Sequence, residues 1–167
     1  MMLEIAIHAD SEWDSSGRWD ELVRSAAEAA IAESGFAQLL SGPRPVELSV
    51  RLASDGEVRA LNSEWRGKDK ATNVLSFPMA GEAELHSTNV AGPEILLGDI
   101  VLARGVCAAE AEDKSVPLEH HAAHLVAHGT LHLLGYDHQD DDQAADMERR
   151  EVRALKRLGI ADPYGDR

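Results

Sequence analysis

The stretch HHAAHLVAHGTLHLLGYDH, residues 120–138, determines how the rest of this chain is arranged. It holds six of the eight histidines in the sequence, and leucine, valine and alanine fill most of the positions between them. This mixture predicts a helix that is mostly buried. Because imidazole is polar, a buried helix with a row of histidines needs a partner or a ligand for each ring.

Three of these histidines have the spacing of metal ligands. His128 and His132 lie four residues apart, so their Cβ atoms are roughly 5–6 Å apart on one helical face. Both rings can then reach one ion at about 2.0–2.1 Å. A third ligand requires the helix to stop, and Gly135 predicts a left-handed cap that turns the chain back and presents His138. Three imidazoles leave one position of a tetrahedral zinc ion open, as in catalytic sites.

The residues around this motif have less specific spacing. His124 extends the row by one turn, and we expect it in the core or behind the ligands as a hydrogen-bond partner. Asp137 is a candidate acceptor for an imidazole N–H, or alternatively a cap of the turn. His120 and His121 lie a turn further from the ion, and we expect them to be surface or helix-start residues.

The motif H-x-x-x-H-x-x-G-x-x-H shares its spacing with the metzincin zinc peptidases. In zinc peptidases a glutamate follows the first histidine and acts as the general base. This chain has Gly129 there. The spacing therefore predicts zinc but argues against a peptidase. The motif alone leaves open whether the zinc is catalytic or only stabilises the fold.

Length and composition limit the class of protein. The 167 residues suit one domain, residues 1–167, and the single cysteine, Cys107, weakly favours a reducing compartment. No signal peptide or membrane-spanning stretch is apparent, so we expect a cytoplasmic protein without a membrane partner. The net charge of −14 restricts any nucleic-acid binding to a local positive patch.

Hydrophobic periodicity predicts four strands followed or separated by helices. The expected strands are 2–8, 46–52, 74–77 and 95–102. The expected helices are 19–33, 54–65, 104–113, 117–134 and 142–158. Residues 80–94 are expected to be a long connection, and Asp99 inside a strand needs a partner such as a loop amide or a histidine. The order predicts an α+β fold, with a mixed four-stranded sheet, about five helices and the metal-binding helix packed centrally across the sheet.

Three segments resemble the YbeY family of bacterial endoribonucleases. They are HGTLHLLGYDH at 128–138, LNSEWRGKDKATNVLSFP at 61–78 and LGDI at 97–100. The resemblance runs from about residue 45 to the last helix. One departure is Asn73, where the family's usual segment has aspartate.

The resemblance implies a single-strand-specific, zinc-dependent endoribonuclease. It implies action in maturation of the 3′ end of small-subunit (16S) ribosomal RNA and in ribosome quality control. The implied partners are single-stranded RNA, the ribosomal small subunit and assembly factors. Two alternatives remain: a zinc hydrolase of another class, peptidase-like included, and a non-catalytic ribosome-assembly factor that zinc only stabilises. One Zn²⁺ per chain would be held by His128, His132 and His138, and the family's important arginine corresponds to Arg66.

The chemistry of RNA cleavage adds candidate residues. Negative charge develops on the phosphate during cleavage, and an arginine fork can bind and stabilise it, which makes Arg66 the candidate catalytic residue. Lys68 and Lys70, with Arg51 and Arg59 nearby in sequence, are candidates for the local positive patch that binds substrate.

Overall fold

The chain is described by a computed structural model that covers residues 3–13, 18–87 and 90–164. It has the predicted α+β fold, with one mixed four-stranded sheet. The strands are β1 (Leu3–Ala9), β2 (Val46–Ala53), β3 (Val74–Pro78) and β4 (Ile95–Ala103). The helices are α1 (Arg18–Ala32), α2 (Asp55–Arg66), α3 (Glu82–Leu85), α4 (Arg104–Lys114), α5 (Leu118–Leu133) and α6 (Asp141–Arg157).

The predicted elements are present within a few residues of their expected bounds. Two short additions were not predicted: a 3₁₀ helix at Ala37–Leu40 and the single turn α3, which lies inside the expected connection 80–94. Helices this short have too few periodic positions to be recognised from a hydrophobic pattern.

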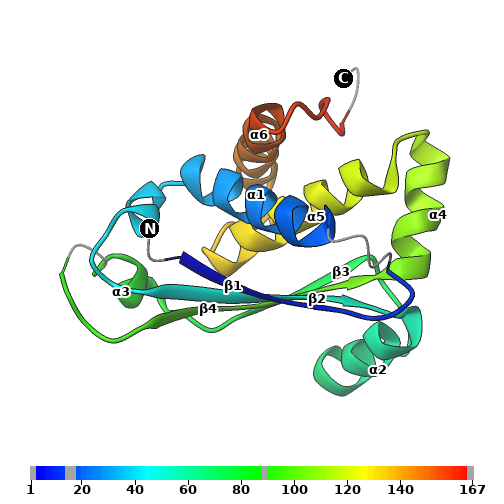
Figure 1. Cartoon of the computed structure of the whole chain (residues 1–167), viewed down its shortest axis with the longest axis horizontal. Coiled ribbons are helices and arrows are strands. Elements are labelled where there is room, and N and C mark those ends of the chain that lie inside the picture. The colour runs from blue at the N-terminus through cyan, green and yellow to red at the C-terminus, as the bar shows by residue number, and fades with distance from the viewer. Residues whose placement is uncertain (1–2, 14–17, 88–89, 165–167) are drawn as a thin grey trace.

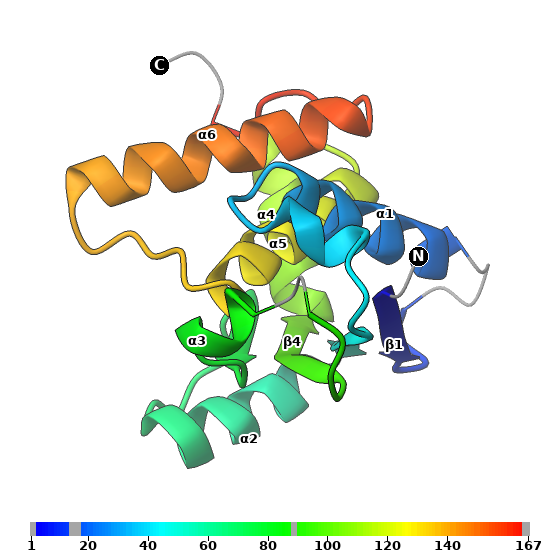
Figure 2. The same cartoon turned by 90° about the vertical axis from the view of Figure 1, so that its left-hand side faces the viewer.

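Strand order, which the sequence did not predict, is β1-β2-β4-β3. β1 and β2 are parallel, as are β2 and β4, whereas β3 runs antiparallel to β4. Figure 1 shows α1, α5 and α6 on one side of this sheet and α2 on the other. In Figure 2, α6 lies beyond α1 and α5, so α5 is enclosed between the sheet and an outer helix.

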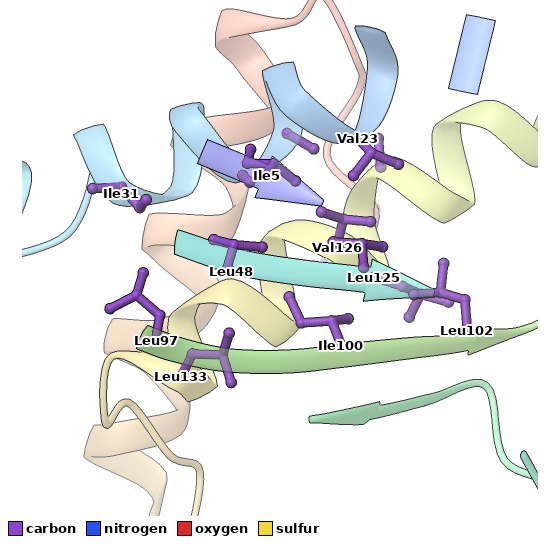
Figure 3. Packing of buried hydrophobic residues seen from close by; sticks show 14 of the residues in the cluster. Ile5, Val23, Ile31, Leu48, Leu97, Ile100, Leu102, Leu125, Val126 and Leu133 are labelled. Carbon is purple, nitrogen blue, oxygen red and sulfur yellow. The ribbon is translucent and has the colours of Figure 1, made fainter. Parts of the chain in front are cut away.

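The main core lies between the sheet and α5. Leu48, Ile100 and Val126 are at most 1% exposed and meet in this interface, as Figure 3 shows. The helix approaches β4 closely at Gly129, where an added Cβ would lie 3.0 Å from Ile100 Cγ2. The glycine that argues against a peptidase therefore has a packing role, because it lets the histidine-rich helix lie against the sheet.

The opposite face of the sheet is partly covered by α2. There Asp99 accepts a hydrogen bond from Ser49 Oγ at 2.5 Å, across the β2–β4 pair. The expectation that Asp99 bonds to a loop amide or a histidine was wrong, since the neighbouring strand supplies the partner. Among the described helices, none has the length and apolar character needed to cross a membrane.

Candidate metal centre

The end of α5 has the geometry that the glycine predicted. Gly135 has φ +95°, and its N–H donates to His132 O at 3.0 Å. Tyr136 N–H donates to Leu131 O, also at 3.0 Å. These two bonds form a Schellman motif, in which glycine adopts the left-handed conformation at low cost and the chain reverses. The reversal brings the next residues back toward the helix.

Three imidazoles meet at this helix end. One ring nitrogen each from His128, His132 and His138 lies within 4.8 Å of the other two. His128 and His132 are partly buried on α5, and His138 is exposed in the segment before α6. The structure thus brings together the three residues that the spacing selected as ligands.

Hydrogen bonds behind two rings determine which nitrogen faces the centre. His132 Nδ1 lies 2.8 Å from Tyr136 O, and His128 Nδ1 lies 3.2 Å from a carboxylate oxygen of Glu151. Each Nδ1 faces an acceptor and therefore carries the hydrogen, which leaves Nε2 of a neutral ring with a bare lone pair.

The two Nε2 atoms of His128 and His132 are 3.1 Å apart. Two lone pairs at this distance repel each other unless a positive charge lies between them. Nitrogens bound tetrahedrally at about 2.0–2.1 Å from one ion would be separated by roughly 3.3 Å. The donor set and its spacing therefore fit a divalent ion such as zinc, with the three histidines as ligands.

The protonation states of the surrounding groups suit cation binding. Burial, together with His128 and His138 nearby, lowers the pKa of His132 below its ordinary value. Burial alone would raise the pKa of Glu151, but hydrogen bonds from His124 and His128 outweigh it and hold the pKa at about 2. At neutral pH this leaves a neutral imidazole at His132 and a carboxylate behind His128.

Glu151 was missed by the sequence reasoning. It lies on α6, is 1% exposed, and also accepts from His124 Nε2 at 2.7 Å. His124, expected in the core or behind the ligands, thus reaches His128 through this carboxylate. A signal was present in the sequence: Met147, Glu151, Ala154 and Leu155 form one helical stripe, in which a glutamate interrupts apolar residues.

His121 lies in the first turn of α5, one of the two positions predicted for it, but it is not at the surface. It is 3% exposed, and its Nε2 lies 2.8 Å from Glu110 Oε1 on α4. The surface alternative was wrong because α4 packs against this turn of α5 and covers it. Asp137, in contrast, is at the turn: its carboxylate accepts the backbone N–H of His138 at 2.8 Å and lies 3.5 Å from the ring Nδ1.

The three histidines open into a cleft of ≈ 520 Å³. Arg66 lines the same cleft although it is distant in sequence. One N–H of its guanidinium donates to Ser76 O at 3.3 Å, and its Cζ lies 6.0 Å from the Phe77 ring centroid. Because guanidinium has five N–H donors, this anchoring leaves capacity for a ligand. The described lining residues are Arg66, Asn73, Val74, Ser76, Pro78, His128, His132, Gly135, Tyr136, Asp137 and His138.

Lys68 and Lys70 are exposed and do not belong to the described cleft lining. The other proposed basic residues are paired with acids. Arg59 binds Asp69 with two contacts of 2.8 and 3.1 Å, and Arg51 binds Glu57. The cations of the predicted patch are thus partly neutralised, and Arg66 is the positive side chain that the described structure places in the cleft.

The departure at Asn73 has a physical explanation. Its side-chain N–H donates to Glu110 Oε1 at 3.0 Å, and the same oxygen faces His121. An aspartate at this position could not donate, and it would place a second negative charge beside Glu110. Asn73 therefore suits an acidic neighbour while still lining the cleft.

A second hollow of ≈ 450 Å³ adjoins this cleft. It shares Pro78, His132, Gly135 and Tyr136 with the cleft, and extends toward Phe36 and Leu85. The added lining is largely apolar, whereas the cleft around the histidines is mainly polar. A polar site thus continues directly into an apolar one.

Fold and site together define an α+β protein with a candidate three-histidine metal centre open to a cleft. A family model described as Endoribonuclease YbeY matches residues 5–159. Endoribonuclease YbeY of Sphingopyxis alaskensis is 51% identical, covering 99% of both chains, and that of Rhizorhabdus wittichii is 49% identical, covering 98% of this chain and 97% of the relative. The chain belongs to the YbeY endoribonuclease family.

The fold also has a solved counterpart. The solution structure of a Thermotoga maritima protein matches with a TM-score of 0.55 and 24% identity, and covers 98% of this chain and 100% of the other. At this identity the match concerns the fold alone.

Proposed function

We propose that residues 1–167 form one zinc-dependent endoribonuclease domain that cleaves single-stranded RNA. The observation that carries the proposal is one cleft lined by three histidines in metal-binding geometry and by Arg66. Membership of an endoribonuclease family supports RNA as the substrate. The peptidase alternative has less support, because Asp137 is the one carboxylate among the described cleft residues and it is bonded to its own turn.

The proposed biological role follows the family resemblance. We infer that the substrate is 16S ribosomal RNA during 3′-end maturation and in ribosome quality control, in the cytoplasm. The small ribosomal subunit and assembly factors would then be the partners.

The residues can contribute to phosphodiester cleavage as follows. When bound, zinc supplies Lewis-acid stabilisation of the negative charge that develops on the phosphoryl oxygens. Arg66 donates charge-assisted hydrogen bonds to the same phosphate, while Ser76 and Phe77 limit the movement of its guanidinium. Lys68 and Lys70 lie outside the described lining and would act only on more distant phosphates.

The neighbouring apolar hollow supports the preference for single strands. It begins at His132 and Tyr136 and extends to Phe36. An unpaired base beside the scissile phosphate can turn into such a hollow and contact an aromatic ring, whereas a base within a duplex stays paired and stacked.

The test combines metal removal with two arginine variants. Cleavage of a single-stranded RNA should require metal and exceed cleavage of the matching duplex. Arg66→Ala should lower kcat/KM by about 10²–10³-fold, the usual effect of removing a donor to developing charge. Zinc content and melting temperature should stay near wild type, because Arg66 is exposed.

Arg51→Ala is the matched control, since it removes the same charge from the other face of the sheet. It should retain cleavage. If Arg66→Ala cleaves as well as Arg51→Ala, or if a chelator has no effect on the wild type, the proposed chemistry is wrong. A protein that binds zinc stoichiometrically without cleaving RNA would favour the non-catalytic assembly factor.

A further inference from the structure

Glu151 is a charged side chain in an apolar environment. It lies on the inner face of α6, between Met147 and Leu155, and is 1% exposed. Removing a carboxylate from water costs several kcal/mol unless hydrogen bonds and opposite charges compensate. The fold must therefore supply donors to this group, and those donors show which part of the molecule the carboxylate serves.

Three donors meet at one oxygen of Glu151. His124 Nε2 lies at 2.7 Å, Tyr164 Oη at 2.8 Å and His128 Nδ1 at 3.2 Å from Oε1. They come from two turns of α5 and from the segment that follows α6. The carboxylate thus joins three separate parts of the chain, and one of its partners is a candidate metal ligand.

The tautomer of His124 shows that this residue supports the carboxylate. Its Nδ1 is buried and has no hydrogen-bond partner among the described residues. A hydrogen on that nitrogen would be an unsatisfied buried donor, so the neutral ring carries its hydrogen on Nε2, facing Glu151. His124 therefore acts as a donor that fixes the carboxylate from one side, as the Tyr164 hydroxyl does from another.

The contact with His128 has a different consequence. Its Nδ1–H faces the carboxylate, so Nε2 is left as a bare lone pair, 3.1 Å from Nε2 of His132. A carboxylate behind a metal-binding imidazole fixes the orientation of the ring and increases the basicity of the nitrogen that binds the metal.

A second carboxylate–histidine pair on α5 provides a contrast. Glu110 lies 2.8 Å from Nε2 of His121, three residues before His124, but no described contact of Glu110 reaches the three candidate ligands. Glu110 therefore supplies a hydrogen-bond partner to a buried ring that is not a candidate ligand. Glu151 differs from it in two respects: it is 1% exposed whereas the Glu110 side chain is 36% exposed, and it contacts His128.

We propose that Glu151 is a positioning residue of the metal site: its carboxylate, held from behind by two other side chains, keeps His128 in the tautomer and orientation that direct Nε2 toward the metal. The inference rests on the proposed role of the three histidines as metal ligands. On this proposal the segment after α6 also contributes to the metal site, which is formed by α5 and the following turn, because Tyr164 donates to Glu151.

The test measures metal binding in the folded protein without any RNA. Zinc affinity is determined by competition with a chromophoric chelator, and Co²⁺ absorption reports the coordination geometry. Glu151→Gln should lower zinc affinity by about 10–100-fold, as is usual when a partner behind a metal ligand is lost. The Co²⁺ spectrum should also change. Glu110→Gln, the matched control, should retain wild-type affinity and spectrum.

Tyr164→Phe removes one hydroxyl while the contact between Glu151 and His128 remains. It should lower zinc affinity less than Glu151→Gln does. If metal-free Glu151→Gln does not fold, Glu151→Asp replaces it, because the shorter side chain keeps the charge but withdraws it from His128. This variant should show the same loss of affinity.

Wild-type zinc affinity and an unchanged Co²⁺ spectrum in a folded Glu151 variant would overturn the inference. An equal loss in Glu110→Gln would also overturn it, since the effect would then be common to the carboxylates that bond to histidines of α5. A wild-type protein that binds no metal would instead contradict the proposed function, so the two failures can be distinguished.

Discussion

The two halves of α5 carry the same kind of side chain in different environments. In the first half, His121 and His124 are at most 7% exposed, and each faces a carboxylate from a neighbouring helix. In the second half, His128 and His132 direct their Nε2 atoms at each other and line an open cleft. One helix thus contains histidines that are paired with carboxylates and histidines whose inner nitrogens form a candidate metal site.

The difference teaches that residue type and helical spacing do not by themselves define a ligand. His124 and His128 are four residues apart, as are His128 and His132, yet only the second pair faces an open side of the fold. Where α4 and α6 cover α5, their acids engage the rings. Where the helix ends and the chain reverses, the rings remain accessible.

Removing a candidate metal ligand from the second half of α5 should give the largest change in zinc affinity. His132→Ala should lower zinc affinity by at least about 100-fold, because loss of a partner behind a ligand alone costs about 10–100-fold. The metal-free protein should lose little stability, since His132 is partly exposed and the repulsion between the Nε2 atoms is relieved. Chelator competition and thermal unfolding measure the two quantities.

A substitution in the first half of α5 should instead lower stability and leave zinc affinity nearly unchanged. His121→Ala should lower the free energy of unfolding by about 2–4 kcal/mol, because it leaves a cavity and removes a partner of Glu110. Zinc affinity should stay within about twofold of wild type. Denaturant unfolding of the metal-free protein, with the same chelator competition, measures both. Strong loss of zinc binding here would break the division of α5 into two halves.

The turn at Gly135, which follows the second half of α5, can be changed without adding a clash. Gly135→Ala should destabilise the protein by about 1–2 kcal/mol, the usual cost of a left-handed conformation with a Cβ. An added Cβ would meet nothing within 4 Å, so the cost comes from backbone conformation. Zinc affinity should also fall, because His138 depends on this turn.

Gly81→Ala is the control for this change. It also has open space around an added Cβ, but φ at Gly81 is −84°. It should leave zinc affinity unchanged, and an equal loss of affinity in both variants would argue against a role for the Gly135 conformation.

The smallest expected effect is on the reactivity of Cys107, which is buried on α4, the helix that packs against α5. Burial, with Glu110 nearby, raises the pKa of Cys107 to about 12. At pH 8 roughly one thiol in 10⁴ is then ionised, so alkylation of the native protein should be very slow. Reaction should be rapid in denaturant. His121→Ala should increase the native rate by loosening this region, whereas His132→Ala should not, and mass spectrometry can follow both.

Several features could be predicted from local sequence because they depend on near neighbours along the chain. The helix, the ligand spacing and the turn at Gly135 all lie within one stretch of eleven residues, 128–138. The strands followed from their apolar patterns. The strand order and the burial of His121 could not be predicted, because they depend on which distant elements pack together.

The sequence by itself determined the type of site: three imidazoles at ligand spacing, and a glycine that allows the chain to return. Only the tertiary structure decided what surrounds it. Packing of α6 against α5 brought Glu151 behind His128, and α2 with β3 brought Arg66 to the cleft. The physical reason is the distance along the chain over which each kind of interaction acts. Backbone conformation and helical periodicity act over a few residues, whereas the partners of a buried polar group are supplied by whichever elements cover it.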